Sequence, residues 1–335
     1  MDVRLSGEQL ALRESAARVV DRLGPRAVGQ LDDAERTSKL DAAIASSGWH
    51  ELRTMNDAGQ PWASAVEAAI VAEELGRGLA DAAFLGPTLA AELRRLASAP
   101  PSSSAVTVAL RTDLGALADG AGDAVAIDAA GATTAFVLDG ERLGEVQLPD
   151  GEVRVDLTRP SVRIDPATIV TPVDGRLGAD DLRKWTAFGL ALTCADLVGT
   201  MRGALQLSCD YATERRQYGV AIGSFQAVQH LLADALVGME GSRSIALHAA
   251  WAVDALPAPD ALAAASAAKA YCARAARSVC ETAIQVHGGI GNTWECLAHV
   301  FLRRALLSTD VLGGVGPSLT RVLAHRGIGG SDGLR

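Results

Sequence analysis

Long stretches of helical periodicity fill the second half of this 335-residue chain and limit its fold more than any other feature. Apolar positions recur there at the period of an α-helix. Ser224 and Thr293 are placed to cap two of these helices at their N-termini. The sequence therefore predicts a C-terminal four-helix bundle with a short last helix, over residues 179–214, 225–255, 258–286, 293–308 and 316–325.

The first 98 residues have a helical pattern as well. Ser6 and Gln9 stand at capping-box spacing, and Gly24-Pro25 ends the first helix. Pro87 falls in the first turn of a later helix, where its missing N–H costs nothing. Further helices are expected at 38–47, 64–76 and 88–97.

The middle of the chain has a different texture. Short β-rich segments, separated by Gly, Asp and Pro, follow a linker with the sequence APPSSS. The segments AVTVAL, DAVAID, TTAFVLD, EVRVDL and ATIVTPV predict a small antiparallel sheet or barrel. The fold class is therefore α+β. Its expected parts are a helical domain (1–98), a reduced β domain (99–178), the bundle (179–326) and a tail (327–335).

Charge and composition limit the partners. The formal net charge is −9, the pI is about 5.2, and no run of Lys and Arg stands out, which argues against nucleic-acid binding. The N-terminus has no apolar signal core, and no apolar run approaches the length of about 18 residues that a membrane span needs. Five cysteines without a C-x-x-C pair indicate thiols in a reducing compartment. We expect a cytoplasmic protein without a metal, because the histidines lack ligand spacing.

Two segments carry candidate chemistry. In YATERRQYGVAIGSFQAVQHLLAD (211–234), a Glu-Arg-Arg cluster ends one helix just before another begins. A cationic side chain beside free helix N–H groups is suited to bind an anion such as a pyrophosphate. In QVHGGIGNTWE (285–295), two glycines let a bulky ligand approach the backbone. Taken alone, each segment is equally compatible with a helix C-cap and surface ion pairs.

Taken together, in this order and spacing, the two segments resemble the C-terminal domain of the acyl-CoA dehydrogenase family. The stretches GWHEL (48–52) and EELGRGLADAAFLGPTLAA (73–91) resemble that family's helical start. The resemblance implies FAD, oxidation of an acyl-CoA to a trans-2-enoyl-CoA, and an electron-transfer flavoprotein as acceptor. It also implies a flavin at a subunit interface, gripped by the positions that match the family's FAD contacts: Arg215, Gln217, Tyr218, Phe225, Gln226, Gln285, Gly288 and Gly289.

Two of the family's features are missing. Between Pro101 and Gly175 there is no T-E-P segment and no Trp to form the W-I-[ST] segment that holds the flavin ring. The family's catalytic glutamate, which removes the α-proton of the thioester, would stand at Leu312 or, on an earlier helix, at Gly189. Weaker alternatives for a base are Asp310, Asp196, Glu295 and His287, each with a structural reading that we favour.

The pattern of kept and lost residues predicts one subunit of a heteromeric enzyme. This chain would supply the AMP and pyrophosphate half of a composite FAD site, and a partner of the same family would supply the flavin cradle and the glutamate. Such chains resemble the smaller subunits of actinobacterial α2β2 acyl-CoA dehydrogenases, which act on steroid side-chain CoA thioesters. The alternatives are a self-sufficient homotetramer with a relocated base and a flavin-free structural or regulatory paralogue.

Overall fold

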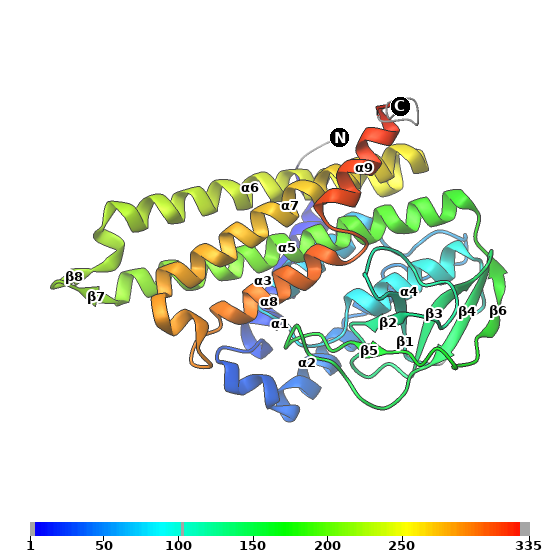
Figure 1. Cartoon of the computed structure of the whole chain (residues 1–335), viewed down its shortest axis with the longest axis horizontal. Coiled ribbons are helices and arrows are strands. Elements are labelled where there is room, and N and C mark those ends of the chain that lie inside the picture. Colours follow the sequence, from blue (N-terminus) through cyan, green and yellow to red (C-terminus); the bar gives the residue numbers. More distant parts are fainter. Residues whose placement is uncertain (1–3, 102–103, 329–335) are drawn as a thin grey trace, which may run out of the picture.

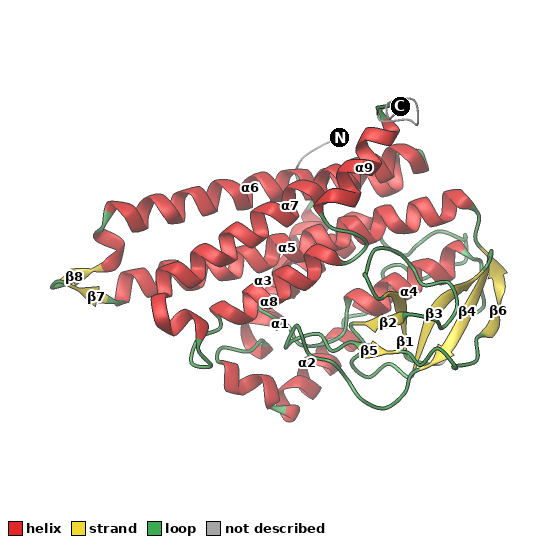
Figure 2. Ribbon diagram, in the orientation of Figure 1, coloured by secondary structure: helices red, strands yellow, loops and turns green. Residues whose placement is uncertain are grey.

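The computed structural model describes residues 4–101 and 104–328, so most of the expected tail and two residues of the expected linker lie outside the described residues. The helical N-terminal part lies along the middle of a long helical bundle, and a small sheet lies at one end of it (Figure 1). Helices and strands are segregated along the chain, which confirms the α+β class (Figure 2).

Four helices precede the sheet: α1 (Gly7–Leu23), α2 (Ala34–Ser46), α3 (Ala65–Arg77) and α4 (Leu85–Leu96). The capping box of Ser6 and Gln9 is present at the start of α1. Helix α2 begins before the predicted position because the Asp33 side chain caps it. Helix α4 also begins early, since a distant carboxylate, Asp128, accepts hydrogen bonds from the N–H groups of Phe84 and Gly86.

The sheet has six strands in the order β5-β2-β1-β3-β4-β6. The prediction of an antiparallel sheet was wrong at one place, because β1 and β3 pair in parallel. That pairing brings together two strands that are not consecutive in the chain, which no local pattern encodes. The strands are β1 (Val106–Arg111), β2 (Ala124–Ile127), β3 (Thr134–Asp139), β4 (Arg142–Gln147), β5 (Val162–Arg163) and β6 (Thr171–Arg176).

Three strand assignments differ from the prediction, and one of them is the two-residue strand β5, which was not predicted. The segment EVRVDL (152–157) forms only an isolated bridge between Val153 and Ser161, because Asp156 turns inward to pair with Arg159. The strand β4 was not predicted. Its signal was the Asp139-Gly140 pair, which makes a tight hairpin with Gly140 at a φ of 61°.

The bundle consists of α5 (Ala179–Glu214), α6 (Gln226–Ala255), α7 (Ala258–His287) and α8 (Ala298–Asp310), followed by α9 (Val315–His325). Helix α8 begins later than predicted, and Thr293 does not cap it, because the Thr293 hydroxyl donates to the carbonyl of Ile290 instead. Ser224 likewise donates to Ala221 and leaves α6 without a side-chain cap. Among the described residues, no helix is long and apolar enough to span a bilayer.

Candidate functional site

Both candidate segments lie at the same end of the bundle. The first runs from the end of α5 through a hairpin, β7 (Arg216–Gln217) and β8 (Val220–Ala221), to the start of α6. The second begins at the end of α7 and continues into a short 3-10 helix, Gly288–Asn292. In Figure 1 the hairpin projects beyond the bundle at the end opposite the sheet.

An aromatic stack joins the two segments. The rings of Tyr211 on α5 and His287 on α7 lie 4.4 Å apart at an interplanar angle of 23°. The Nδ1–H of the buried His287 donates to the carbonyl of Ala283 at 2.7 Å, because a carbonyl oxygen can only accept. His287 therefore packs the two helix ends together, which is the structural role that we favoured over a role as a base.

The side chains proposed to contact FAD face solvent. Tyr218 is 94% exposed and has a φ of 53°, in the left-handed region that side chains other than Gly rarely adopt. Its ring meets Phe225 edge-on at 6.3 Å. Gln217, Gln226 and Gln285 are also exposed. The geometry presents two aromatic rings and several amides at one convex tip.

This tip has the properties that a negatively charged ligand requires. The Arg215 side chain is exposed and forms no ion pair or hydrogen bond with any other described residue, so its charge is available. A Cβ built on Gly288 or Gly289 would meet nothing within 4 Å, so the backbone there is open to a close approach. The residues therefore fit the adenosine pyrophosphate end of a dinucleotide.

The two family positions for a catalytic glutamate face each other across the core. A Cβ added to Gly189 on α5 would lie 2.2 Å from Leu312 Cδ1 and 3.2 Å from Leu89 Cδ2 on α4. Leu312 is fully buried, with none of its surface accessible. The space between α4, α5 and the turn after α8 is thus filled by an alkyl side chain, and neither position can remove a proton.

Asp310 and Glu295 do not replace the missing base. Asp310 is the last residue of α8 and is exposed. Glu295 was expected in the first turn of a helix, but this was wrong, because it lies in the turn before α8 begins. Both carboxylates are solvated, as ordinary surface acids are.

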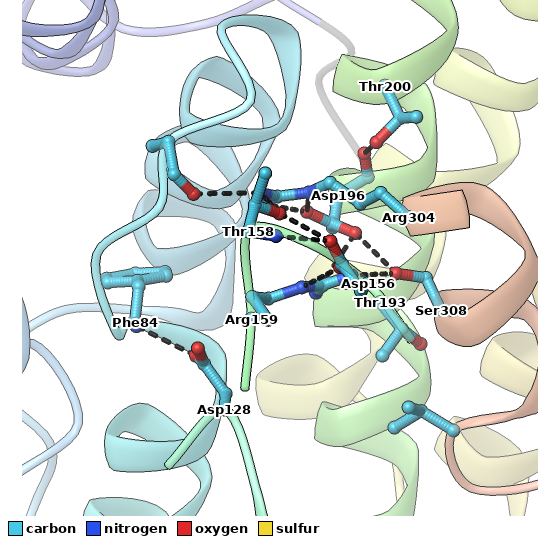
Figure 3. A network of polar contacts seen from close by, with 12 residues as sticks. Phe84, Asp128, Asp156, Thr158, Arg159, Thr193, Asp196, Thr200, Arg304 and Ser308 are labelled. Carbon is cyan, nitrogen blue, oxygen red and sulfur yellow. Dashed lines mark hydrogen bonds and ion pairs between the residues drawn. The ribbon is translucent and has the colours of Figure 1, made fainter. Parts of the chain in front are cut away.

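Asp196 is the centre of a buried ion-pair network (Figure 3). Its Oδ1 accepts from Arg304 Nη2 at 2.7 Å, and its Oδ2 accepts from the Ser308 hydroxyl at 2.7 Å. Arg159 reaches the same carboxylate at 3.3 Å. Burial raises the pKa of Asp196, but the charges of Arg159 and Arg304 outweigh that effect and hold the pKa below its usual value.

The network connects the sheet region to the bundle. Arg159 binds Asp156 at 2.9 Å, and Arg304 donates to Thr158 Oγ1 at 3.0 Å and to the carbonyl of Ala80 at 2.8 Å. Figure 3 shows that the loop carrying Asp156, Thr158 and Arg159 faces α5 and α8 at this point. A residual cavity of only about 10 Å³ remains among Asp128, Arg159, Asp196 and Arg304. Asp196 is therefore a structural anion with both oxygens engaged.

Lys269 on α7 is a buried cation that the sequence analysis missed. Its Nζ donates to Thr193 Oγ1 at 3.0 Å, and Thr193 lies one helical turn after Gly189 on α5. Burial lowers its pKa to about 8, although Cys194, Cys272, Asp196 and Asp310 act to raise it. The available signal was a single lysine inside an otherwise small and apolar helical stretch, AAASAAKAYC.

A large surface groove lies away from both sites. It has a volume of about 1130 Å³ and runs between α1, α5 and α6. Its arginines Arg77 and Arg202 are already paired with Glu74. This groove holds none of the residues that were predicted to contact cofactor.

Comparison with known proteins agrees with the resemblance. A family profile described as "Acyl-CoA dehydrogenase, C-terminal domain" matches residues 184–327. Acyl-CoA dehydrogenase IpdE2 of Mycobacterium tuberculosis is 32% identical over 91% of this chain and 93% of its own length. IpdE2 of Mycolicibacterium smegmatis is 28% identical over 96% of this chain and 99% of its own length.

Two solved structures have the same fold. A variant of the Tcur3481-Tcur3483 steroid ACAD superposes with a TM-score of 0.79 at 22% identity, covering 96% of this chain and 98% of its own. The ChsE4-ChsE5 complex of Mycobacterium tuberculosis superposes with a TM-score of 0.78 at 23% identity, covering 98% of this chain and 99% of its own.

Proposed function

We propose, from the premise that this chain belongs to the acyl-CoA dehydrogenase family, that it is the FAD-gripping, base-lacking subunit of a heteromeric acyl-CoA dehydrogenase. The observation that carries the proposal is a contrast within one chain. The residues that match the family's FAD contacts stand exposed at one tip, whereas both base positions are closed by Leu312 over Gly189.

The exposed tip is suited to act across an interface. Arg215 supplies a positive charge for the pyrophosphate, and Tyr218 and Phe225 supply aromatic faces for stacking. FAD, when bound, supplies the hydride acceptor of the reaction. The chain's own part is to bind and orient one end of that cofactor, while a partner chain of the same family supplies the ring cradle and the glutamate.

The substrate that we propose is a bulky acyl-CoA, a steroid side-chain CoA thioester. One structure of the same fold is a steroid ACAD, which supports this choice. The proposed composite site would leave one active site for each pair of unlike chains, and therefore more room for a bulky acyl group. An α2β2 assembly, cytoplasmic localisation and an electron-transfer flavoprotein as acceptor belong to the same proposal.

Co-expression with a chain of the same family that keeps the catalytic glutamate and the flavin-ring segments tests the assignment. We expect a yellow complex with one FAD per pair of unlike chains, and a lone chain without flavin. A lone chain that is yellow and active would refute the proposal and favour a homotetramer with a relocated base. The structure supports that alternative poorly, because Asp196 is fully engaged and Asp310 faces solvent.

Substitutions at the tip separate a flavin-binding subunit from a flavin-free paralogue. Arg215→Ala or Gln285→Ala is expected to weaken FAD retention by the complex about tenfold or more, because each removes a hydrogen-bond donor that the anionic cofactor would use. Arg277→Ala is the matched control, since Arg277 is an exposed cation on α7 that pairs with Glu281. Equal FAD retention in all of these variants would favour the paralogue.

A further inference from the structure

The buried Lys269 binds the end of α8. Its side chain is completely inaccessible to solvent. Besides Thr193, its Nζ donates to the carbonyl of Val311 at 3.0 Å and to the carbonyl of Ser308. All three ammonium hydrogens are therefore used, and no described acidic side chain forms an ion pair with Lys269.

The acceptors are carbonyls that the helix itself leaves unsatisfied. The carbonyls of the last turn of an α-helix have no N–H partner within the helix and carry its partial negative charge. Lys269 on α7 binds one such carbonyl, that of Ser308, and also the carbonyl of Val311, which caps the end of α8. Arg321 on α9 donates to the carbonyl of the following residue, Leu312, at 2.9 Å. Two cations from different helices thus hold one short segment, Ser308–Leu312.

The segment needs such support because its backbone is strained. Leu312 has a φ of 60°, a left-handed conformation that costs a residue with a Cβ on the order of 1 kcal/mol. In this conformation its N–H donates to the carbonyl of Leu114 at 2.7 Å, and its side chain covers Gly189. If the backbone at Leu312 relaxed to a right-handed conformation, its N–H would turn away from Leu114 and its side chain would turn away from Gly189.

We propose that Lys269 is a positioning residue: its ammonium fixes the turn after α8 so that the side chain of residue 312 faces Gly189 on α5. The inference concerns this chain alone and does not depend on which partner it has. It also means that α7 helps to set the direction of the side chain at this turn, together with Arg321 of α9 and the carbonyl of Leu114. Leu312 then seals the space between α4 and α5 because Lys269 aims it there.

Thiol labelling of residue 312 tests the proposal in the full chain. In a Leu312→Cys variant the thiol is expected to react slowly with an aromatic disulfide reagent, because it points at Gly189 inside the core. Adding Lys269→Met is expected to raise the labelling rate about tenfold or more, since the contacts of a charged donor are lost. Peptide mass mapping distinguishes this thiol from the five native cysteines.

A matched variant separates positioning from general stability. Cys280→Ala removes another fully buried side chain from α7, away from the turn, and is expected to leave the labelling rate within about twofold. An equal rise in both variants, or no rise with Lys269→Met, would overturn the proposal.

Amide hydrogen exchange in the unmodified chain needs no variant. The N–H of Leu312 is expected to exchange as slowly as the amides in the middle of α7, because a fixed turn opens only when the surrounding core opens. Exchange as fast as in exposed loops would show that the turn is not fixed, and the role of Lys269 would fall with it.

Discussion

The contact between Leu312 and Gly189 makes a quantitative prediction for a double-mutant cycle. Leu312 is fully buried, and a Leu→Ala change in a protein core costs about 2.7–5.0 kcal/mol of unfolding free energy. The backbone strain at Leu312 stays the same in Leu312→Ala, because alanine also has a Cβ. The measured loss therefore reports the alkyl group that covers Gly189.

Gly189→Ala acts from the other side of the contact. Its new Cβ would lie 2.2 Å from Leu312 Cδ1, so overpacking should cost about 1–3 kcal/mol, partly offset by about 1 kcal/mol from the better helix propensity of alanine. In the double variant, the alanine Cβ occupies space that Leu312 has vacated. We expect the pair to cost about 1–2 kcal/mol less than the sum of the two single changes.

Urea unfolding followed by circular dichroism measures all four corners of the cycle. Gly238→Ala combined with Leu312→Ala is the control, because a Cβ on Gly238 in α6 would lie 3.9 Å from its packing neighbours Ala275 and Val279 on α7. That pair should be additive within about 0.5 kcal/mol. If the Gly189 and Leu312 changes are also additive within about 0.5 kcal/mol, the Leu312 side chain does not pack against Gly189, and the reasoning is refuted.

Two further outcomes follow from the buried charges, and a third follows from a close approach of two helices. Asp196→Asn should lower the free energy of unfolding by about 3–5 kcal/mol, because Arg159 and Arg304 would lose the negative charge that they share. Glu281→Gln, in an exposed ion pair, is the control and should change it by less than about 0.5 kcal/mol. Thermal unfolding of both variants makes the comparison. The folded pKa of Lys269 lies near 8, below its ordinary 10.5, so the unfolded chain binds the proton more tightly and stability should rise with pH across that window, by on the order of 3 kcal/mol. The increment should be absent from Lys269→Met when unfolding is measured at each pH, and a flat difference between the two proteins would contradict it. Gly199→Ala should destabilise strongly, because its Cβ would lie 1.9 Å from the carbonyl oxygen of Glu73 on α3, and a melting temperature near that of the unmodified chain would show that the two backbones are not in contact.

Local patterns predicted the helices well because their signals lie within the helices themselves. The capping box at Ser6 and the long apolar periodicity of α5 to α7 are examples. Several of the errors occur where a distant group decides. Helix α4 starts early because Asp128 caps it from another part of the chain, and residues 152–157 leave the sheet because Asp156 pairs with Arg159.

The candidate site divides in the same way. The order and spacing of the two motifs named residues that the fold brings together at one exposed tip. Alignment by spacing also named Leu312 and Gly189, but their contact could not be read from positions more than a hundred residues apart. Lys269 was missed because its acceptors are backbone carbonyls, which every residue has.

The shared carboxylate of Asp196 has a consequence for how the chain responds to heat. Arg159 from the loop beside the sheet and Arg304 from α8 share that anion, although Arg159 also pairs with Asp156, and Ser308 connects the carboxylate to the turn held by Lys269. Separating the sheet from the bundle would break the buried ion pair between Arg159 and Asp196 and the hydrogen bond from Arg304 to Thr158. The sheet and the bundle should therefore melt together in a single calorimetric transition, and a substitution in either part should lower the same melting temperature.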